Sequence, residues 1–252
     1  MRMQYAAYST AGYIRDINED NLYIQGTTKS INRANFRKTG IIKAESGLFA
    51  VCDGLGGEGN GERAAAIAVE CLKEYQTTFI EDYQEYLEKA NEEICSRQNK
   101  DCKMGCTMAA LAIQNEKSIG VNLGDSRIYL IRDNTMTQMT KDHSEFEIMK
   151  NYGLVKEEEY YSSNLRNTLT RHLGNIEKGE YLQPFVSEDL EIEQDDMFLL
   201  CSDGLCGVLR NEQMLEFICQ KGSLRKRCIE LVKGALAAGG EDNVTAILIQ
   251  CN

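Results

Sequence analysis

Residues 49–61 read FAVCDGLGGEGNG, and this stretch decides how the rest of the chain is interpreted. A short apolar run stops at Asp53, and five glycines share the eight positions from 54 to 61. The following residues, 62–76, carry apolar side chains at the i, i+3, i+4 and i+7 spacing of a helix face: Ala65, Ala68, Val69 and Leu72. Such dense glycines let the backbone turn sharply and approach a ligand closely. An aspartate at a strand end beside bare carbonyl groups therefore suits a hard cation.

Two other interpretations of these glycines stay open from the stretch alone. Gly54, Gly56 and Gly59 satisfy the dinucleotide-binding fingerprint between a strand and a helix. That motif requires an acidic residue on a second strand about 20 residues further on, whereas that distance here falls in or just past a predicted helix. It also gives Asp53 no role. The remaining interpretation is a glycine-rich turn with a solvated aspartate.

Composition is that of an ordinary globular protein and argues against several classes. The chain has 252 residues, of which 42% are apolar and 27% charged, enough for a sizeable core. Its net charge of −11 argues against nucleic acid as a partner, because no basic excess is present to neutralise phosphates. No apolar run reaches membrane-spanning length, so no membrane association is expected. Ten cysteines, without a signal peptide or a C-x-x-C pair, predict a reducing cytoplasmic location and no zinc site.

Periodicity predicts the elements of the first half of the chain. Strands are expected at 3–9 and 22–25, and the polar, locally basic residues 26–46 are expected to form a loop or an irregular hairpin. A second helix is expected from Thr78. From Gly105 the pattern changes to short strands separated by turn residues, at 106–113, 119–123, 127–131 and 135–139. These spacings predict one antiparallel meander, which argues against the parallel strands and helical crossovers of a dinucleotide fold.

The second half begins with a long polar region, residues 140–180, in which only 144–151 has a helical pattern. A region of this kind inside a compact domain is typical of a functional flap. The remaining elements are predicted strands at 190–193, 197–201 and 244–250, and predicted helices at 211–219 and 223–238. No linker or internal repeat interrupts the pattern. A single domain, 1–252, is therefore expected.

Acidic residues recur at the borders of the apolar strands: Asp20, Asp53, Asp203 and Asp242, with Asp125 in the predicted turn Gly124-Asp125-Ser126. Each of them alone is best explained as a turn former. If these strand ends converge, the carboxylates repel one another unless they take up protons or cations neutralise them. All-oxygen ligands suit magnesium or manganese. Two such ions about 3.5–4 Å apart are what an in-line phosphate hydrolase uses.

With this set of residues, the chain resembles the metal-dependent protein phosphatases, the type 2C family, in their compact bacterial form. The likeness covers nearly the whole chain and rests on eight motifs in the family order. They are Arg15-x-x-Asn18-Glu19-Asp20, Asp53-Gly54-x-Gly56-Gly57, Gly105-Cys106-Thr107, Gly124-Asp125-Ser126-Arg127, Asp142-His143-Ser144, Leu169-Thr170-Arg171-x-Leu173-Gly174, Ser202-Asp203-Gly204-Leu205 and Asp242-Asn243.

The resemblance implies an α+β fold, a four-layer α/β/β/α sandwich in which helices flank two antiparallel sheets. It implies that Asp53 bridges two metal ions and that the Gly54 carbonyl binds one of them. Asp203 and Asp242 would complete the ligands of the other ion. Asp20 would act directly or through water, with Glu19 beside it.

Further roles follow from the same resemblance. Arg15 would clamp the substrate phosphate, a task suited to a guanidinium group. Asp125 with Asp203 matches a weaker third metal site of bacterial members, and residues 140–168 match their mobile flap. Leu55 stands where some members carry a histidine that protonates the leaving group, so water is the expected acid in this chain.

The function implied is hydrolysis of phosphoserine and phosphothreonine by a hydroxide that two Mn²⁺ or Mg²⁺ ions activate. The substrate would be a phosphorylated protein, and the enzyme would oppose a serine/threonine kinase. A cytoplasmic monomer is expected, with neither nucleic acid nor membrane as a partner. The alternative is a catalytically weak regulatory member that binds phosphoproteins.

Overall fold

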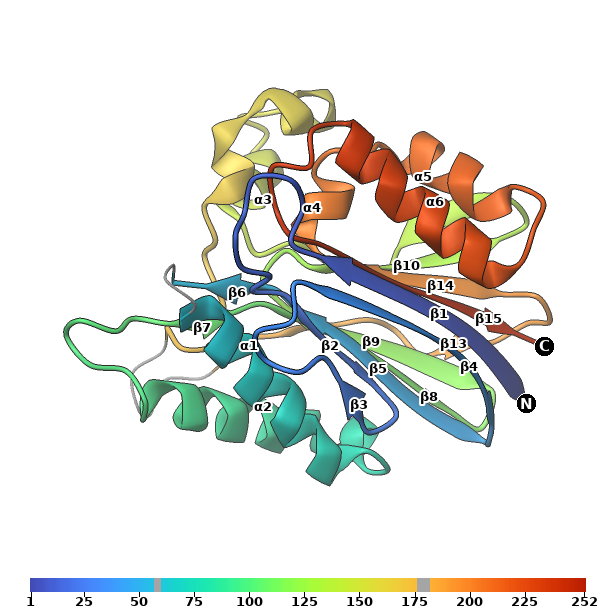
Figure 1. Cartoon of the computed structure of the whole chain (residues 1–252), viewed down its shortest axis with the longest axis horizontal. Coiled ribbons are helices and arrows are strands. Elements are labelled where there is room, and N and C mark those ends of the chain that lie inside the picture. The colour runs from blue at the N-terminus through green and yellow to red at the C-terminus, as the bar shows by residue number, and fades with distance from the viewer. Residues whose placement is uncertain (57–59, 176–181) are drawn as a thin grey trace.

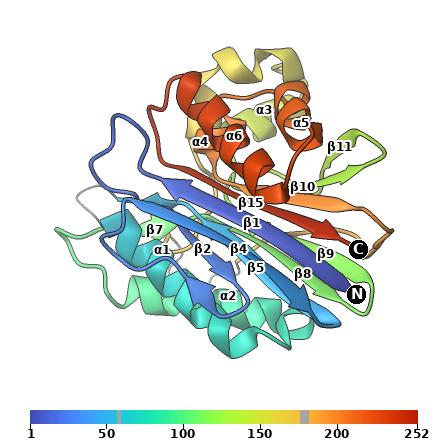
Figure 2. The same cartoon turned by 45° about the vertical axis from the view of Figure 1, so that its right-hand side comes forward.

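Two antiparallel β-sheets lie face to face, and helices cover both outer faces, as Figures 1 and 2 show from two directions. The computed structural model describes residues 1–56, 60–175 and 182–252. The layers follow the order helix, sheet, sheet, helix, which confirms the predicted fold class.

The first sheet has the strand order β11-β10-β14-β15-β1-β4, and every neighbouring pair is antiparallel. Its strands are β1 (Arg2–Thr10), β4 (Asn35–Lys43), β10 (Arg127–Arg132), β11 (Thr135–Gln138), β14 (Met197–Cys201) and β15 (Val244–Cys251). The strands nearest the two ends of the sequence, β1 and β15, therefore lie side by side.

The second sheet has the order β12-β9-β8-β5-β2-β3, with β13 also paired to β9. Its strands are β2 (Asn21–Ile24), β3 (Thr27–Thr28), β5 (Ser46–Cys52), β8 (Met108–Gln114), β9 (Lys117–Leu123), β12 (Phe185–Val186) and β13 (Leu190–Glu191). A separate short ladder joins β6 (Gly54–Leu55) to β7 (Gly105–Cys106). Because β5 is antiparallel to both β2 and β8, the dinucleotide interpretation of residues 54–59 is wrong.

Helices cover the outer face of each sheet. The second sheet is covered by α1 (Asn60–Cys71), the 3₁₀ turn η1 (Leu72–Tyr75) and α2 (Phe79–Cys95). The first sheet is covered by α4 (Asp203–Cys206), α5 (Asn211–Cys219) and α6 (Leu224–Ala237). The predicted flap contains α3 (Glu145–Asn151), η2 (Glu157–Ser162) and η3 (Asn164–Asn167). The helices predicted at 144–151, 211–219 and 223–238 are thus confirmed as α3, α5 and α6.

β1 shows how the layers follow from the sequence. Met3, Tyr5 and Ala7 point into the apolar layer between the sheets, whereas Ala6 and Tyr8 point toward the helices. Alternate residues of a strand face opposite sides. Since both sides of this strand are covered, the strand needs apolar residues at nearly every position.

The prediction of a loop or irregular hairpin at 26–46 was wrong for its second half. β4 has nine residues and pairs with β1 along its whole length, from Arg2 opposite Lys43 to Thr10 opposite Asn35. β4 is the edge of its sheet, and many of its side chains stay exposed, Arg37 and Ile41 among them. A strand of this kind carries a weak apolar signal, which is why the periodicity did not reveal it.

The predicted meander was also wrong, because its strands belong to two different sheets. β8 and β9 lie in the second sheet, whereas β10 and β11 lie in the first. Residues 124–126 therefore carry the chain from one sheet to the other, and they are not a hairpin turn.

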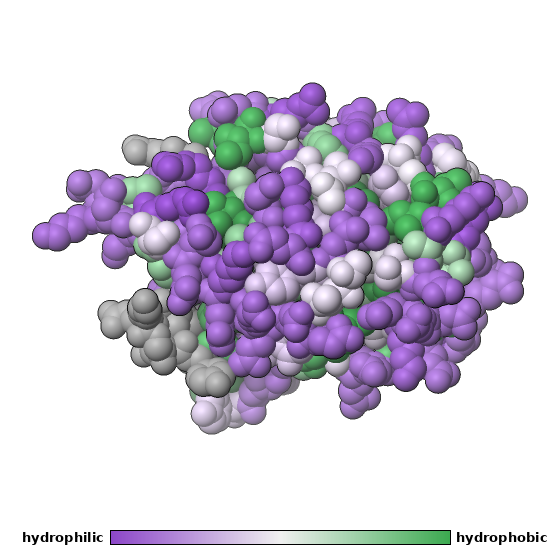
Figure 3. All heavy atoms as spheres, turned by 90° about the horizontal axis from the view of Figure 1, so that it is seen from below, coloured by the Kyte–Doolittle hydropathy of each residue, from purple (hydrophilic) through white to green (hydrophobic). Residues whose placement is uncertain are grey.

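The helical faces turn their apolar side inward. On α2, the helix expected from Thr78, the side chains of Tyr86, Leu87, Ala90 and Ile94 are buried against the second sheet. Figure 3 views the molecule from below, and hydrophilic side chains cover most of that face, with apolar atoms in small separate areas. Within the three described ranges, no helix has the length and apolar character needed to cross a membrane.

Candidate active site

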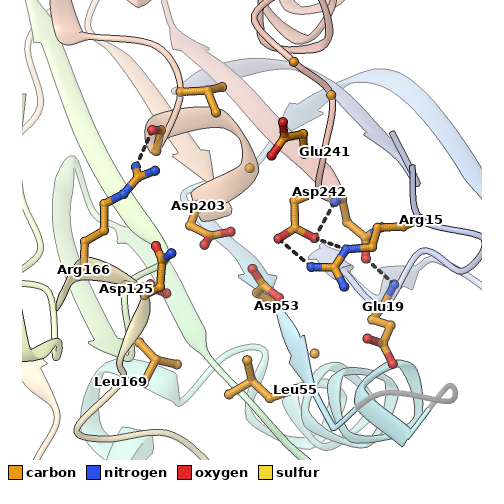
Figure 4. Close-up of a pocket in the computed structure, with 18 of the residues that line it drawn as sticks. Arg15, Glu19, Asp53, Leu55, Asp125, Arg166, Leu169, Asp203, Glu241 and Asp242 are labelled. Atoms are coloured by element: carbon orange, nitrogen blue, oxygen red, sulfur yellow. Dashed lines mark hydrogen bonds and ion pairs between the residues drawn. The ribbon is translucent and has the colours of Figure 1, made fainter. Parts of the chain in front are cut away.

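The predicted site residues meet at one end of the two sheets, around a cavity of about 590 Å³ (Figure 4). β5 ends there in the second sheet, while β14 ends and β15 begins there in the first. Seven of the eight predicted residues line the cavity: Arg15, Glu19, Asp53, Gly54, Asp125, Asp203 and Asp242. The eighth, Asp20, is fully buried and does not line it.

Asp53 follows the last residue of β5, and Thr107 holds its backbone. The Thr107 N–H donates to the Asp53 carbonyl at 2.8 Å, and the Asp53 N–H donates to Thr107 Oγ1 at 2.9 Å. The Thr107 hydroxyl also shares a 2.7 Å hydrogen bond with Ser126 Oγ. Because Ser126 follows Asp125, this threonine ties the segment that carries Asp53 to the segment that carries Asp125.

Gly54 and Gly61 are glycines because their backbones touch. A Cβ on Gly54 would lie 2.3 Å from the carbonyl carbon of Gly61 and 2.6 Å from the carbonyl oxygen of Glu19. Gly61 is in the first turn of α1, and its N–H donates to Glu19 Oε1 at 3.2 Å. The start of α1 is therefore packed against Gly54 while it holds the Glu19 carboxylate.

A buried polar network fixes Asp20. Its Oδ2 accepts hydrogen bonds from Ser202 Oγ at 2.8 Å and from Thr245 Oγ1 at 2.6 Å. Thr245 is in turn bonded to Ser9 Oγ at 2.7 Å, and Asn18 Nδ2 donates to Ser9 Oγ at 2.9 Å. This network joins the loop of residues 18–20 to β1, to β15 and to the residue before α4.

Asp203 and Asp242 come from the first sheet. Asp203 is the first residue of α4, and Asp242 stands two residues before β15. A Cβ on Gly204 would lie 1.9 Å from the carbonyl oxygen of Asn243. The glycine of the Ser-Asp-Gly motif is thus required by close packing, and this packing places the two aspartates at the same cavity (Figure 4).

Asp125 lies at the crossover between the sheets and is buried, with 7% of its surface exposed. Its carboxylate lines the cavity with those of Asp53 and Asp203, and the three are labelled together in Figure 4. The prediction that Asp125 lies in a turn between two strands of one meander is therefore wrong.

Burial and like charge destabilise the ionised form of these acids. The pKa values of Asp53 and Asp125 are raised well above the usual range, chiefly by burial and then by neighbouring carboxylates. The same two causes raise the pKa of Asp203. The pKa of Asp20 rises to about 7 because of its burial, in spite of its two hydroxyl donors. Positive charge in the cavity would remove this repulsion.

The donor set fits divalent cations. Oδ1 of Asp20 and Oδ1 of Asp203 are buried and have no hydrogen-bond partner in the described part of the chain, so each has an oxygen lone pair to offer. The groups are carboxylate oxygens with a backbone carbonyl at Gly54, the ligands that Mg²⁺ and Mn²⁺ prefer. Among the residues that the structure describes, no three His, Cys, Asp or Glu side chains already lie close enough to enclose one ion. Ion binding would therefore draw the carboxylates together.

Arg15 stands at the rim of the cavity and pairs with Asp242. Its Nε lies 3.1 Å from Oδ1 and its Nη2 lies 3.2 Å from Oδ2 of that carboxylate. About half of each side chain is exposed, 56% for Arg15 and 44% for Asp242. The structure thus places this guanidinium beside the site, with its Nε and Nη2 edge toward a carboxylate of the site (Figure 4).

Two groups of site residues were not assigned a role from the sequence. Asn243 accepts from the Glu19 N–H at 2.7 Å and donates to the carbonyls of Ala11 and Ile17, so it holds the loop that carries Arg15. The Asp242-Asn243 motif pointed to this asparagine, but the motif did not indicate which groups its side chain contacts.

Arg166 and Tyr160, from the predicted flap, also line the cavity. The Arg166 guanidinium lies 5.6 Å from the centre of the Tyr160 ring and donates to the carbonyl of Gly207. Figure 4 shows it across the cavity from Arg15. No sequence pattern distinguishes these two residues from the rest of a polar segment.

Comparison with known proteins identifies the family. The model of the family described as protein phosphatase 2C matches residues 25–244. The chain belongs to this family. The serine/threonine phosphatase stp of Listeria welshimeri is 30% identical over 220 residues, which are 81% of this chain and 84% of that protein.

Solved structures of similar chains have the same four-layer fold. A crystal structure of the Mycobacterium tuberculosis serine/threonine phosphatase PstP/Ppp gives a TM-score of 0.81 at 29% identity and covers 100% of both chains. The serine/threonine phosphatase of S. agalactiae gives 0.84 at 26% identity, over 99% of this chain and 100% of that one. The catalytic domain of PstP in complex with two manganese ions gives 0.80 at 27% identity, over 99% of both chains.

Proposed function

We propose that this chain is a metal-dependent protein serine/threonine phosphatase, which hydrolyses phosphoserine and phosphothreonine in proteins with two bound Mn²⁺ or Mg²⁺ ions. The observation that carries the proposal is the meeting of Asp53, Asp203 and Asp242, from two sheets, at one cavity in a chain of the protein phosphatase 2C family. A relative that is similar over its whole catalytic domain contains two manganese ions, which supports the choice of metal.

Each of the two ions would be held by its own set of residues. Asp53 would bridge the two ions, with the Gly54 carbonyl on one and Asp203 and Asp242 on the other. Asp20 and Glu19 would support the site, directly or through water. Bound divalent cations supply Lewis acidity, which makes water a stronger nucleophile and neutralises the phosphoryl group. We include a third, weaker site at Asp125 and Asp203, supported by the burial of Asp125 beside the same cavity.

The chain's own side chains would orient the substrate and exclude water. Arg15 has a half-exposed guanidinium at the rim, free to turn from Asp242 to a phosphate. Tyr160 and Leu169, from the flap side, cover part of the cavity. No histidine is among the described residues that line it. Leu55 is apolar, so the leaving oxygen would take its proton from water.

The partners follow from the reaction. The substrates are phosphorylated proteins, and the enzyme opposes a serine/threonine kinase. We propose a monomer in the cytoplasm, supported by the cysteine usage of the chain, since seven of its ten cysteines are buried inside the fold. No observation favours the catalytically weak regulatory member, which is one of the outcomes of the test below.

The test is hydrolysis by the purified chain after treatment with chelator. With added Mn²⁺ we expect turnover of p-nitrophenyl phosphate and of phosphoserine and phosphothreonine peptides, and no turnover in chelator. Asp53→Asn should lower turnover by several orders of magnitude and keep a native circular dichroism spectrum. Binding of phosphopeptides without turnover would indicate the regulatory alternative. Turnover that persists in excess chelator would contradict the proposal.

A further inference from the structure

Lys29 lies between β3 and β4 and is buried, with 2% of its surface exposed. Its ammonium group donates to the backbone carbonyls of Asn18 at 2.9 Å and Arg33 at 3.2 Å. Its third contact is Glu62 Oε1, at 3.4 Å. A lysine has three N–H donors, and here each has an acceptor. The sequence predicted only a polar, irregular segment at this position.

Glu62 provides the other half of the ion pair from a different layer of the fold. It belongs to the first turn of α1 and is 4% exposed. Its Oε1 also accepts a hydrogen bond from the Asn32 N–H at 2.7 Å. The pair therefore fastens the segment between β3 and β4 to the helix that begins at the candidate site.

On one side, the pair reaches the loop that carries two of the proposed ligands. Asn18, whose carbonyl accepts from Lys29, immediately precedes Glu19 and Asp20. The Lys29 backbone is fixed as well, because its N–H donates to Asn21 Oδ1 at 3.0 Å. The position of the ammonium group is thus set by contacts on both sides of the ligand pair 19–20.

On the other side, the pair reaches Gly54 through α1. Glu62 immediately follows Gly61, which packs against Gly54 and donates to Glu19 Oε1. A shift of the Glu62 side chain with its helix turn would therefore move the backbone on which Gly54 rests. Among the residues that the structure describes, no other ion pair links these two segments.

Stability alone does not explain a buried pair of this kind. Burial lowers the pKa of Lys29 and opposes the effect of Glu62, which raises it. Apolar residues of similar volume often replace such pairs without loss of stability. The property that apolar residues cannot supply is a fixed distance and direction between polar groups. This property is what a cation site built from separate segments requires.

We propose that Lys29 and Glu62 are positioning residues for the cation site, which hold residues 18–20 and the start of α1 at the separation needed for Glu19, Asp20 and the Gly54 carbonyl to bind ions. This inference rests on the proposed function, since it concerns the same cations. It assigns a role to the segment between β3 and β4.

The test compares two double variants. K29M/E62Q removes both charges together, so neither partner is left buried without the other, and the glutamine still offers an oxygen to the Asn32 N–H. K89M/E74Q is the matched control, because Lys89 and Glu74 form an exposed ion pair between α2 and η1, whose residues do not line the cavity. Both variants and the wild-type chain are studied first in chelator and then with MnCl₂.

Two measurements separate positioning from stability. In chelator, hydrogen exchange at the amides of residues 17–20 should be faster in K29M/E62Q than in the wild type and the control. In calorimetric titration, K29M/E62Q should bind Mn²⁺ about 10- to 100-fold more weakly, the usual effect of losing groups that orient metal ligands. Its kcat at saturating Mn²⁺ should stay within a few-fold of the wild-type value.

A lower melting temperature with wild-type Mn²⁺ affinity and wild-type exchange would assign the pair to stability alone and overturn the proposal. If the wild-type chain itself binds no Mn²⁺, the proposed function fails instead. If K29M/E62Q does not fold, E62D decides. It keeps the charge beside Lys29 but withdraws the carboxylate by one methylene group from Lys29 and from the Asn32 N–H, so it should weaken Mn²⁺ binding and speed exchange at residues 17–20. Unchanged affinity and exchange in E62D would then overturn the proposal.

Discussion

Under the proposed function Arg15 would serve two anions, and the structure shows it with one of them, Asp242. The Asp242 carboxylate raises the pKa of the Arg15 guanidinium and lies 3.1 Å from it. Both side chains are about half exposed, and pairs of this kind contribute only about 0–1 kcal/mol. A cation that takes the Asp242 oxygens would therefore release Arg15 for a phosphate at little cost.

For Arg15→Ala we expect a higher KM for phosphopeptides, with kcat/KM lower by about 10- to 150-fold, because a charge-assisted contact to phosphate contributes roughly 1.5–3 kcal/mol. Mn²⁺ affinity should stay equal or increase, since the variant removes a competitor for Asp242. Steady-state kinetics and calorimetry measure the two quantities. Weaker Mn²⁺ binding with normal kinetics would mean that Arg15 only orients Asp242.

Asp125→Asn should stabilise the metal-free protein. Asp125 is buried beside Asp203, and both burial and that neighbour disfavour its charge. Removing one of several uncompensated buried charges should raise the melting temperature in chelator. The control is Asp133→Asn in the hairpin between β10 and β11, which should have little effect.

With saturating Mn²⁺, Asp125→Asn should instead have a lower melting temperature than the wild type, because the variant has lost a cation ligand. Its hydrolysis of phosphopeptides should also be slower. Equal melting temperatures for Asp125→Asn and Asp133→Asn in chelator would contradict the charge argument. Wild-type turnover at saturating Mn²⁺ would remove the third cation site from the proposal.

His143 should make the folded state sensitive to acid. Its Nδ1 accepts from the Gly124 N–H at 3.1 Å, and burial lowers its pKa to about 4. The unfolded chain binds a proton at this residue below about pH 6.5. The free energy of unfolding therefore falls as the pH decreases from about 6.5 to about 4.

In His143→Asn the amide oxygen can still accept from Gly124, and the titrating group is gone. Between pH 7.5 and pH 4.5, the unfolding free energy of the wild type should decrease by about 2 kcal/mol more than that of the variant. Urea titrations of both proteins at both pH values give this difference. The contributions of the carboxyl groups cancel in it, because the two proteins share them. Parallel curves would show that His143 is not responsible.

At the scale of elements, Tyr160 is a main attachment of the flap to the sandwich, beside the Arg166 and Tyr161 contacts to the carbonyls of Gly207 and Leu209. The Tyr160 ring lies over the buried Arg127 guanidinium, 4.7 Å from its centre, and makes edge contacts with Phe146 and Tyr161. Arg127 is itself held by Asp142, with contacts of 2.6–3.1 Å. The flap therefore rests on a cation that belongs to the first sheet.

Tyr160→Ala should release the flap without unfolding the molecule. We expect faster tryptic cleavage within 140–168 in the native state, while the melting temperature falls by only a few degrees. Tyr160→Phe keeps the ring and should behave like the wild type, because the stacking contacts do not need the hydroxyl. Equal cleavage rates in all three proteins would show that the flap is held by other contacts.

Elements with a strong period were predictable from the sequence, and elements defined by their neighbours were not. α5 and α6 bury one face and expose the other, so their residues follow the helical spacing closely. β10 and β9 are buried on both sides, and nothing in an apolar strand tells which of two sheets it joins. For the same reason the crossover at Asp125 was mistaken for a turn.

At the scale of the whole molecule, the site could be predicted because its residues occur in a family order along the chain. That order indicated that Asp53, Asp203 and Asp242 meet, although nearly 190 residues separate the first from the last. It could not give the Arg15–Asp242 pair or the contacts of Lys29, because these depend on the packing of loops whose residues have no regular period.

Mn²⁺ should stabilise the entire fold, because both sheets contribute to its site. A ligand present at about 100 times its Kd adds about 2.7 kcal/mol to the free energy of unfolding. For a chain of this length, that corresponds to roughly 5–10 °C in melting temperature. Differential scanning calorimetry with and without Mn²⁺ measures the shift, which Asp53→Asn should largely lose. An unchanged melting temperature in the wild type would contradict the binding of cations at this site.

The two sheets also set the size of the site. Asp53 is mounted on one sheet and Asp203 and Asp242 on the other, so the spacing between these carboxylates depends on the thickness of the apolar layer between the sheets. Side chains such as Phe198 and Ile247 determine that thickness, and close-packed interiors transmit small changes in volume. Magnesium tolerates little deviation from its short, octahedral contacts. Residues that touch neither metal nor substrate would thus tune which ion the enzyme prefers.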